Sequence, residues 1–117
     1  MELTLTSVLA VFLGGALGGV ARAWISAKVV GPVGILLVNV SGSFALGLLA
    51  GFATQSSLLW LVLATGVLGA FTTVSSFALL SVQMWGAGRK KRASGYVVMS
   101  VLSSVCAVGL GFWVAAP

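Results

Sequence analysis

Three hydroxyl-bearing residues recur near the end of the chain at a spacing of four: Tyr96, Ser100 and Ser104. Four residues is close to one α-helical turn, so this spacing places their hydroxyls in a line on one helix face. Two interpretations are open. The line is either a packing seam of small residues or a row of donors for a small, strongly hydrated anion. The weak, repeated sites that fast conduction needs favour hydroxyls over a lysine for the second role.

Asn39 is a single amide within the apolar stretch of residues 32–53. Polar groups inside a membrane are costly and are therefore candidates for function. Its amide can donate to an anion or can bond to a neighbouring helix, and the second role is the more common for a lone asparagine.

The third polar feature is the hydroxyl-rich segment GAFTTVSSF, residues 69–77. It lies within residues 58–88, which would span about 46 Å as one straight helix, against ~30 Å for a hydrocarbon core. An interrupted helix is one interpretation, because unwound carbonyls at mid-membrane can coordinate a cation. The other is a tilted, continuous helix whose hydroxyls bond back to its own carbonyls. The sequence favours neither.

Composition identifies the elements that must position these residues. The chain has 117 residues, of which 60% are hydrophobic and 6% charged. Charge-free stretches of 19, 60 and 25 residues begin at positions 3, 29 and 93. Since a spanning helix needs roughly 20 apolar residues, we predict four, at about 3–25, 32–53, 58–88 and 93–115. The fold class is therefore an all-α membrane protein, with residues 1–117 as one domain.

The titratable residues argue against enzyme chemistry. With a single acid, a single cysteine and no histidine, the chain cannot build a carboxylate pair, a Ser–His or Cys–His pair, or a zinc site of His and Cys. The basic run at 89–92 is typical of a juxtamembrane segment beside lipid rather than of a nucleic-acid site.

The basic residues also predict topology. Arg22 and Lys28 flank the first loop, and the other four form the third loop. Four spans place both loops on one face, and the positive-inside rule makes that face cytoplasmic, with both termini outside. We expect a multi-pass protein of a bacterial-type plasma membrane.

Three segments together resemble the Fluc (CrcB) family of fluoride channels: GGALGGVAR at 14–22, GILLVNVSGSF at 34–44 and GVLGAFTTVSSF at 66–77. The resemblance extends over all four predicted helices. It implies a passive, selective channel that exports cytoplasmic fluoride, built as an antiparallel dimer with two pores and a structural sodium ion at its centre. The carbonyls of Gly69 and Thr72 match the sodium ligands. The residues implied to line or flank the pore are Arg22, Asn39, Ser75, Phe77, Tyr96, Ser100 and Ser104.

The chain departs from the family pattern at three positions. Val74 replaces one of the two phenylalanines that contact fluoride, Leu80 replaces a usual glutamate and Ile35 a usual threonine. A homodimer would lack these groups in both pores.

The distribution of basic residues suggests which subunit supplies these missing groups. A chain that inserts in both orientations needs balanced basic residues, whereas this one carries all six on one face. We therefore expect a single orientation, and an antiparallel partner that is an oppositely biased homologue.

Two alternatives belong to other classes. One is a non-conducting structural subunit of such a channel. The other, much weaker, is a small multidrug transporter, which resembles this chain in size but needs an acid inside the membrane for proton exchange, whereas the only acid here is Glu2.

Overall fold

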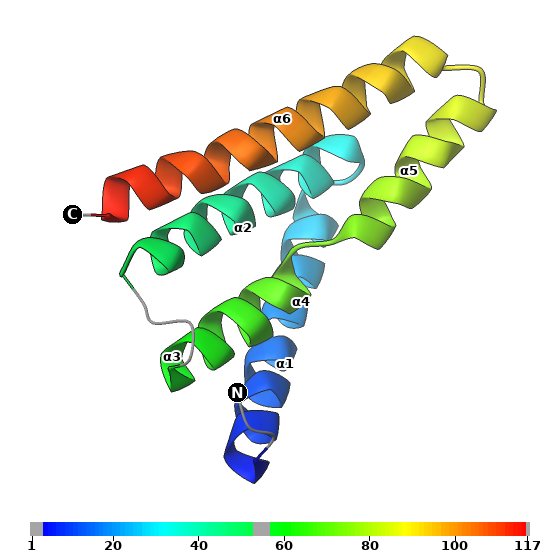
Figure 1. Ribbon diagram of the computed structural model, residues 1–117. Helices are drawn as coiled ribbons and strands as arrows, with labels where there is room; N and C mark the ends of the chain where they lie inside the picture. The colour runs from blue at the N-terminus through cyan, green and yellow to red at the C-terminus, as the bar shows by residue number, and fades with distance from the viewer. Residues whose placement is uncertain (1–3, 53–56, 117) are drawn as a thin grey trace.

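The computed structural model describes residues 4–52 and 57–116, all of whose regular elements are helices (Figure 1). Their bounds are α1 Leu5–Lys28, α2 Pro32–Phe52, α3 Leu58–Trp60, the π-helical segment η1 Leu61–Leu68, α4 Gly69–Phe71, α5 Val74–Gly86 and α6 Lys90–Ala115. Four stretches of the described residues are long and apolar enough to cross a membrane: Leu5–Lys28, Pro32–Phe52, Leu58–Gly86 and Lys90–Ala115. The prediction of four spans is confirmed.

The helices form two arms (Figure 1). In one arm α2 and α6 lie side by side and run in the same direction; in the other α1 packs against η1 and α4. α5 leaves the second arm and returns to contact the first half of α6. The chain thus brings α2, α5 and α6 together around the point where the third span is interrupted.

Glycines allow the paired helices to approach closely. A Cβ on Gly47 would overlap the Val108 carbonyl, and one on Gly111 would overlap the Phe44 carbonyl. Gly51 lies one turn further on, beside Ala115. Small residues at such positions let helix backbones meet where lipid provides no hydrophobic drive for association. These contacts also fix the alignment of α2 with α6, in which residue 47 lies opposite residue 108.

Glycines also allow the helices of the other arm to pack closely. A Cβ on Gly14 would overlap the Val62 carbonyl, and one on Gly18 would overlap the Val67 carbonyl. Both carbonyls belong to η1, whose eight residues have the wider π-helical turn. π-Helical segments of this length are rare, and no pattern in the sequence predicts this one.

The third span is interrupted at Thr72 and Thr73. Both residues have extended backbone, with φ/ψ of −77°/154° and −144°/119°. α5 restarts directly after them, where the Thr73 side chain accepts a hydrogen bond from the Ser76 N–H at 3.1 Å. Of the two interpretations of residues 69–77, the interrupted helix is therefore the observed one.

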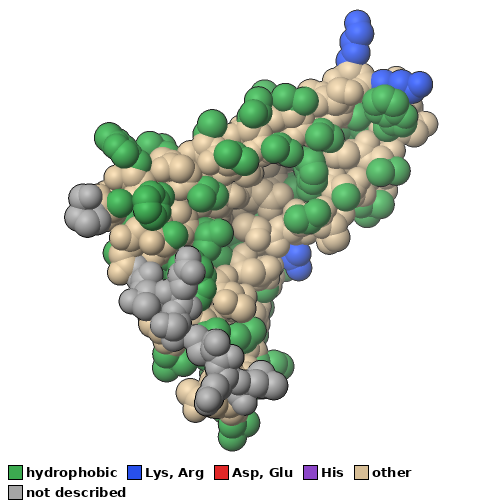
Figure 2. Space-filling view, viewed as in Figure 1, with side chains coloured by type: hydrophobic (Ala, Val, Ile, Leu, Met, Phe, Trp, Pro, Cys, Tyr) green, Lys and Arg blue, Asp and Glu red, His purple; other side chains and the backbone are tan. Residues whose placement is uncertain are grey.

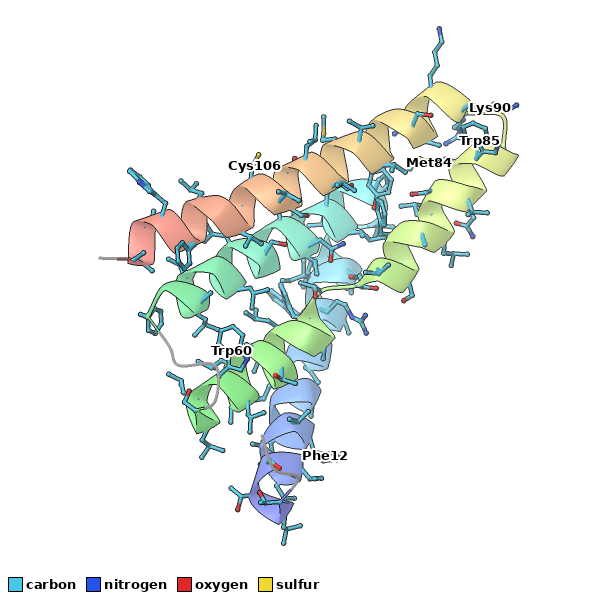
Figure 3. All side chains as sticks on the ribbon, in the orientation of Figure 1. Phe12, Trp60, Met84, Trp85, Lys90 and Cys106 are labelled. Atoms are coloured by element: carbon cyan, nitrogen blue, oxygen red, sulfur yellow. The ribbon has the colours of Figure 1, made fainter. Side chains whose placement is uncertain are left out.

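The boundary between the third and fourth spans differs from the prediction. α5 ends at Gly86 rather than near 88, and α6 begins at Lys90 rather than near 93. A turn of three residues suffices because Gly88 adopts a φ of 84°, a conformation that glycine adopts without strain. Most of the basic run is therefore helical, and the Lys90 ammonium lies over the Trp85 ring at 5.2 Å (Figure 3).

The other predicted ends agree to within a few residues. α1 extends to Lys28, three residues beyond the predicted end, and residue 53, the expected end of the second span, lies outside the described residues, as does Glu2.

Most large apolar side chains face outward. Figure 2 shows them over both arms, with basic side chains gathered where α5 meets α6. Leu5 and Trp113, for example, are 76% and 77% exposed. Patches of this extent on a soluble monomer would be unusual, so the surface fits a lipid environment and further protein contacts.

Candidate functional site

A groove of about 430 Å³ runs between α2, the interrupted third span and α6. Six of the residues selected from the sequence line it: Asn39, Gly69, Thr72, Phe77, Ser100 and Ser104. They come from three separate spans, so the groove exists only because α5 folds back toward α6. Among residues 4–52 and 57–116, no lysine, arginine or acid lines it.

Asn39 connects α2 to the interruption. Its Nδ2 donates to the Thr73 carbonyl at 2.9 Å, and its Oδ1 accepts from the Thr73 N–H at 2.8 Å. Thr73 is 6% exposed, and an interrupted helix leaves its backbone groups without helical partners. The amide satisfies both of them. Since Nδ2 carries two hydrogens, one N–H of Asn39 is still available, so the two roles considered for this residue are compatible.

Two hydroxyls in the predicted line are buried and unpaired. Tyr96 is 9% exposed and Ser100 5% exposed, and neither hydroxyl has a hydrogen-bond partner within residues 4–52 and 57–116. The ring of Tyr96 packs against that of Phe77, with centroids 5.4 Å apart and planes tilted by 46°. Buried polar groups are nearly always satisfied, so such a pair beside a groove is typical of a site that receives a ligand or water.

The hydrogen bonds at the interruption leave two carbonyls without their helical donors. In a continuous helix the Gly69 carbonyl would accept from the Thr73 N–H, which instead donates to Asn39. The Thr72 carbonyl would accept from the Ser76 N–H, which instead donates to the Thr73 hydroxyl. These are the two carbonyls that the family resemblance assigns to sodium, and hard oxygen donors of this kind suit a cation.

The structure places the remaining predicted residues outside the groove. Tyr96 does not line the groove, and its ring packs against that of Phe77, which does. Ser75 is exposed, with its hydroxyl 3.3 Å from that of Thr73. Arg22 is half-buried on α1, on the helix face that carries Gly14 and Gly18, because the three positions are spaced by four.

The positions that depart from the family pattern have different surroundings. Val74 lines the groove and is 79% exposed. Leu80 packs against the buried cluster of Met84, Ala93 and Tyr96. Ile35 is half-buried on α2.

Sequence reasoning missed two polar residues of the groove. Thr73 provides the backbone that Asn39 binds and the cap of α5, and Ser43 lines the groove beside Ser104. Ser43 follows Asn39 by four residues, so the spacing that identified the hydroxyl line on the last span was also present on the second.

Comparison with known proteins identifies the family of this chain. A family profile described as "CrcB-like protein, Camphor Resistance (CrcB)" matches residues 9–112. A protein of Saccharophagus degradans named fluoride-specific ion channel FluC is 43% identical over 109 residues, which cover 86% of this chain and 82% of that protein. One of Rhodopseudomonas palustris named fluoride-specific ion channel FluC 2 is 40% identical, with 96% and 95% covered. A FluC of Francisella tularensis is 38% identical, with 92% of each covered. This chain belongs to the CrcB family.

Proposed function

We propose that this chain is a subunit of a passive fluoride channel that lets fluoride leave the cytoplasm. The observation that carries the proposal is the pair of buried, unpaired hydroxyls of Tyr96 and Ser100 beside a groove without charged residues. Relatives of nearly full-length similarity bear the name fluoride-specific ion channel, which identifies fluoride as the anion.

The groove chemistry suits this ion. Fluoride is small and gives up its hydration only to groups that donate hydrogen bonds, which the hydroxyls and the free N–H of Asn39 do. The Phe77 ring adds a positive edge. Because none of these groups carries a full charge, each holds the ion weakly enough for it to leave, as conduction requires.

Fluoride efflux from proteoliposomes tests the proposal. Vesicles loaded with potassium fluoride and made permeable to potassium with an ionophore should release fluoride to an external electrode only when the channel is present. Release of chloride at the same rate, or no release of fluoride from any assembly that contains this chain, would contradict the proposal.

We further propose that the carbonyls of Gly69 and Thr72 contribute to a structural sodium site. Their lost helical donors support this assignment. Sodium at about 100 times its Kd would stabilise the folded protein by ~2.7 kcal/mol. Thermal unfolding in sodium, compared with N-methylglucamine at equal ionic strength, measures the effect. Equal unfolding temperatures in the two salts would remove the assignment.

The assembly that we propose is an antiparallel dimer with a second, oppositely oriented homologue. Five of the six basic residues lie in the third loop or at the helix ends that flank the first and third loops, and Arg22 lies in α1, six residues before its end. The positive-inside rule then favours one orientation, with both termini outside. The exposed Val74 at the groove has no aromatic edge, and a partner could supply the missing aromatic group. Purification of this chain alone as a fluoride-conducting antiparallel homodimer would contradict the heterodimer.

Val74 also supports a second candidate, a subunit that stabilises the dimer without conducting through its own groove. Asn39→Ala or Phe77→Ala on this chain only, in an active pair, separates the two. A fall in fluoride efflux supports a conducting groove, and unchanged efflux supports the structural role.

A further inference from the structure

Ser43 lies one helical turn beyond Asn39 on α2 and lines the same groove. The alignment of α2 with α6 determines what it faces. Gly47 lies against the Val108 carbonyl and Gly51 against Ala115. Because α2 and α6 run in the same direction, moving four residues toward the start of each helix from the contact between residues 47 and 108 leads to Ser43 on α2 and Ser104 on α6. These two serines therefore face each other.

The same alignment pairs Asn39 with Ser100 one further turn back. Both of these residues line the groove, as do Ser43 and Ser104. The groove wall between α2 and α6 therefore has two successive levels of polar groups, each with one member on either helix. Cys106, by contrast, points away from α2 on the outer side of α6 (Figure 3).

The hydroxyl of Ser43 differs from those of Ser41 on α2 and Ser81 on α5. Ser41 donates to the Leu37 carbonyl at 2.6 Å, and Ser81 to the Phe77 carbonyl at 2.8 Å. This back-bonding is how a helix usually satisfies a serine in apolar surroundings. In the part of the chain that the structure describes, no hydrogen bond involves the hydroxyl of Ser43 or of Ser104. Both are free to donate to a ligand in the groove.

We infer that Ser43 is a further fluoride-contacting residue, which together with Ser104 forms a second donor level beyond Asn39 and Ser100. This inference rests on the proposed function and extends the ion path by one turn of α2. A dehydrated fluoride that leaves the first level then meets two more hydroxyl donors about 6 Å further along, the rise of one turn. Such closely spaced, weak sites allow an ion to advance without returning to water.

The matched pair Ser43→Ala and Ser41→Ala tests this assignment. The two serines are two residues apart on one helix, and Ser41 is exposed and already bonded to its own helix. A hydrogen bond to a charged group is worth about 1.5–3 kcal/mol, so we expect Ser43→Ala to slow fluoride efflux by about tenfold or more. Ser41→Ala should leave efflux within about twofold, as expected for an exposed position without a special role.

Two further measurements separate an ion contact from a structural role. Ser43→Thr keeps the hydroxyl and should restore most of the efflux. The unfolding temperature of Ser43→Ala should match that of the unsubstituted protein, because the hydroxyl bonds to no described residue. A lowered unfolding temperature, or equal efflux for Ser43→Ala and Ser41→Ala in an active channel, overturns this inference alone. Absence of fluoride efflux from the unsubstituted channel overturns the proposed function and this inference with it.

Discussion

Replacement of Asn39 by alanine should destabilise the interruption of the third span. The substitution removes both hydrogen bonds to Thr73, at 2.9 and 2.8 Å, and leaves two buried backbone groups unpaired. Hydrogen bonds between membrane helices average ~0.6 kcal/mol, so two set a lower limit of ~1.2 kcal/mol. A buried group left without a partner costs ~1–3 kcal/mol, which gives ~2–6 kcal/mol for two.

We expect a loss of about 2–3 kcal/mol in the free energy of unfolding, within these limits. The Thr73 N–H has an alternative acceptor nearby, because the Gly69 carbonyl lies four residues back and has lost its helical donor. If the Thr73 N–H partly re-forms its helical bond to the Gly69 carbonyl, the loss in unfolding free energy becomes smaller and the interrupted segment becomes more helical. The carbonyl proposed to bind sodium would then be occupied, so the stabilisation by sodium should also decrease.

Unfolding of the detergent-solubilised protein, followed by tryptophan fluorescence, measures the free energy. Hydrogen exchange of the Thr73 amide, which we expect to be about tenfold faster, reports the local change. Ser41→Ala is the control, with an expected cost below about 0.5 kcal/mol. If Asn39→Ala costs no more than this control and the Thr73 amide keeps its protection, Asn39 does not hold the interruption.

Four further substitutions follow from the geometry. Gly111→Ala places a Cβ against the Phe44 carbonyl and should cost about 1–3 kcal/mol of stability. Gly109→Ala meets nothing within 4 Å and should keep or raise the thermal unfolding temperature, because alanine favours a helix more than glycine does. Thr73→Ala removes the cap of α5 and should cost about 1 kcal/mol in the same unfolding measurement. Tyr96→Phe removes a buried, unpaired hydroxyl, so it should keep or raise stability while it lowers fluoride efflux; a loss of stability would mean that the hydroxyl has a structural partner.

The parts of the fold that could be predicted depend on local composition. Lengths of charge-free sequence identified four spans. The excess length of the third span left an interrupted helix and a tilted continuous helix equally open, and only the structure places the interruption at Thr72 and Thr73. The start of α6 was placed three residues late, because a run of four basic residues resembles a loop and cations at a helix N-terminus oppose the helix dipole. Composition alone does not predict the tight turn at Gly88, which depends on backbone conformation. Nor does it predict the contact between Lys90 and Trp85, which depends on how the two helices are placed.

Six of the predicted residues line the groove, whereas the hydrogen bonds among the groove residues could not be predicted. Spacing alone placed Ser100 and Ser104 on one face, and both line the groove. That Asn39 would bond to the backbone of Thr73, 34 residues away, depends on how α2 is aligned with the interruption. That alignment is set by helix packing, and Ser43 was overlooked because its role depends on which residue of α6 lies opposite it.

In the proposed channel, hydrogen bonding at the interruption would allow one break in a helix to serve two ions of opposite charge. An interrupted helix frees N–H groups and carbonyls in equal number. Here side chains take up the N–H groups of Thr73 and Ser76. Within the part of the chain that the structure describes, no hydrogen bond replaces the helical donors of the Gly69 and Thr72 carbonyls. Acceptors are therefore in excess on the backbone of the interruption, where a cation would be stabilised. Tyr96 and Ser100 contribute unpaired hydroxyl donors on the neighbouring helix, where an anion would be stabilised. Asn39 keeps the two regions distinct, because its amide bonds to the backbone of the interruption while its second N–H remains a donor.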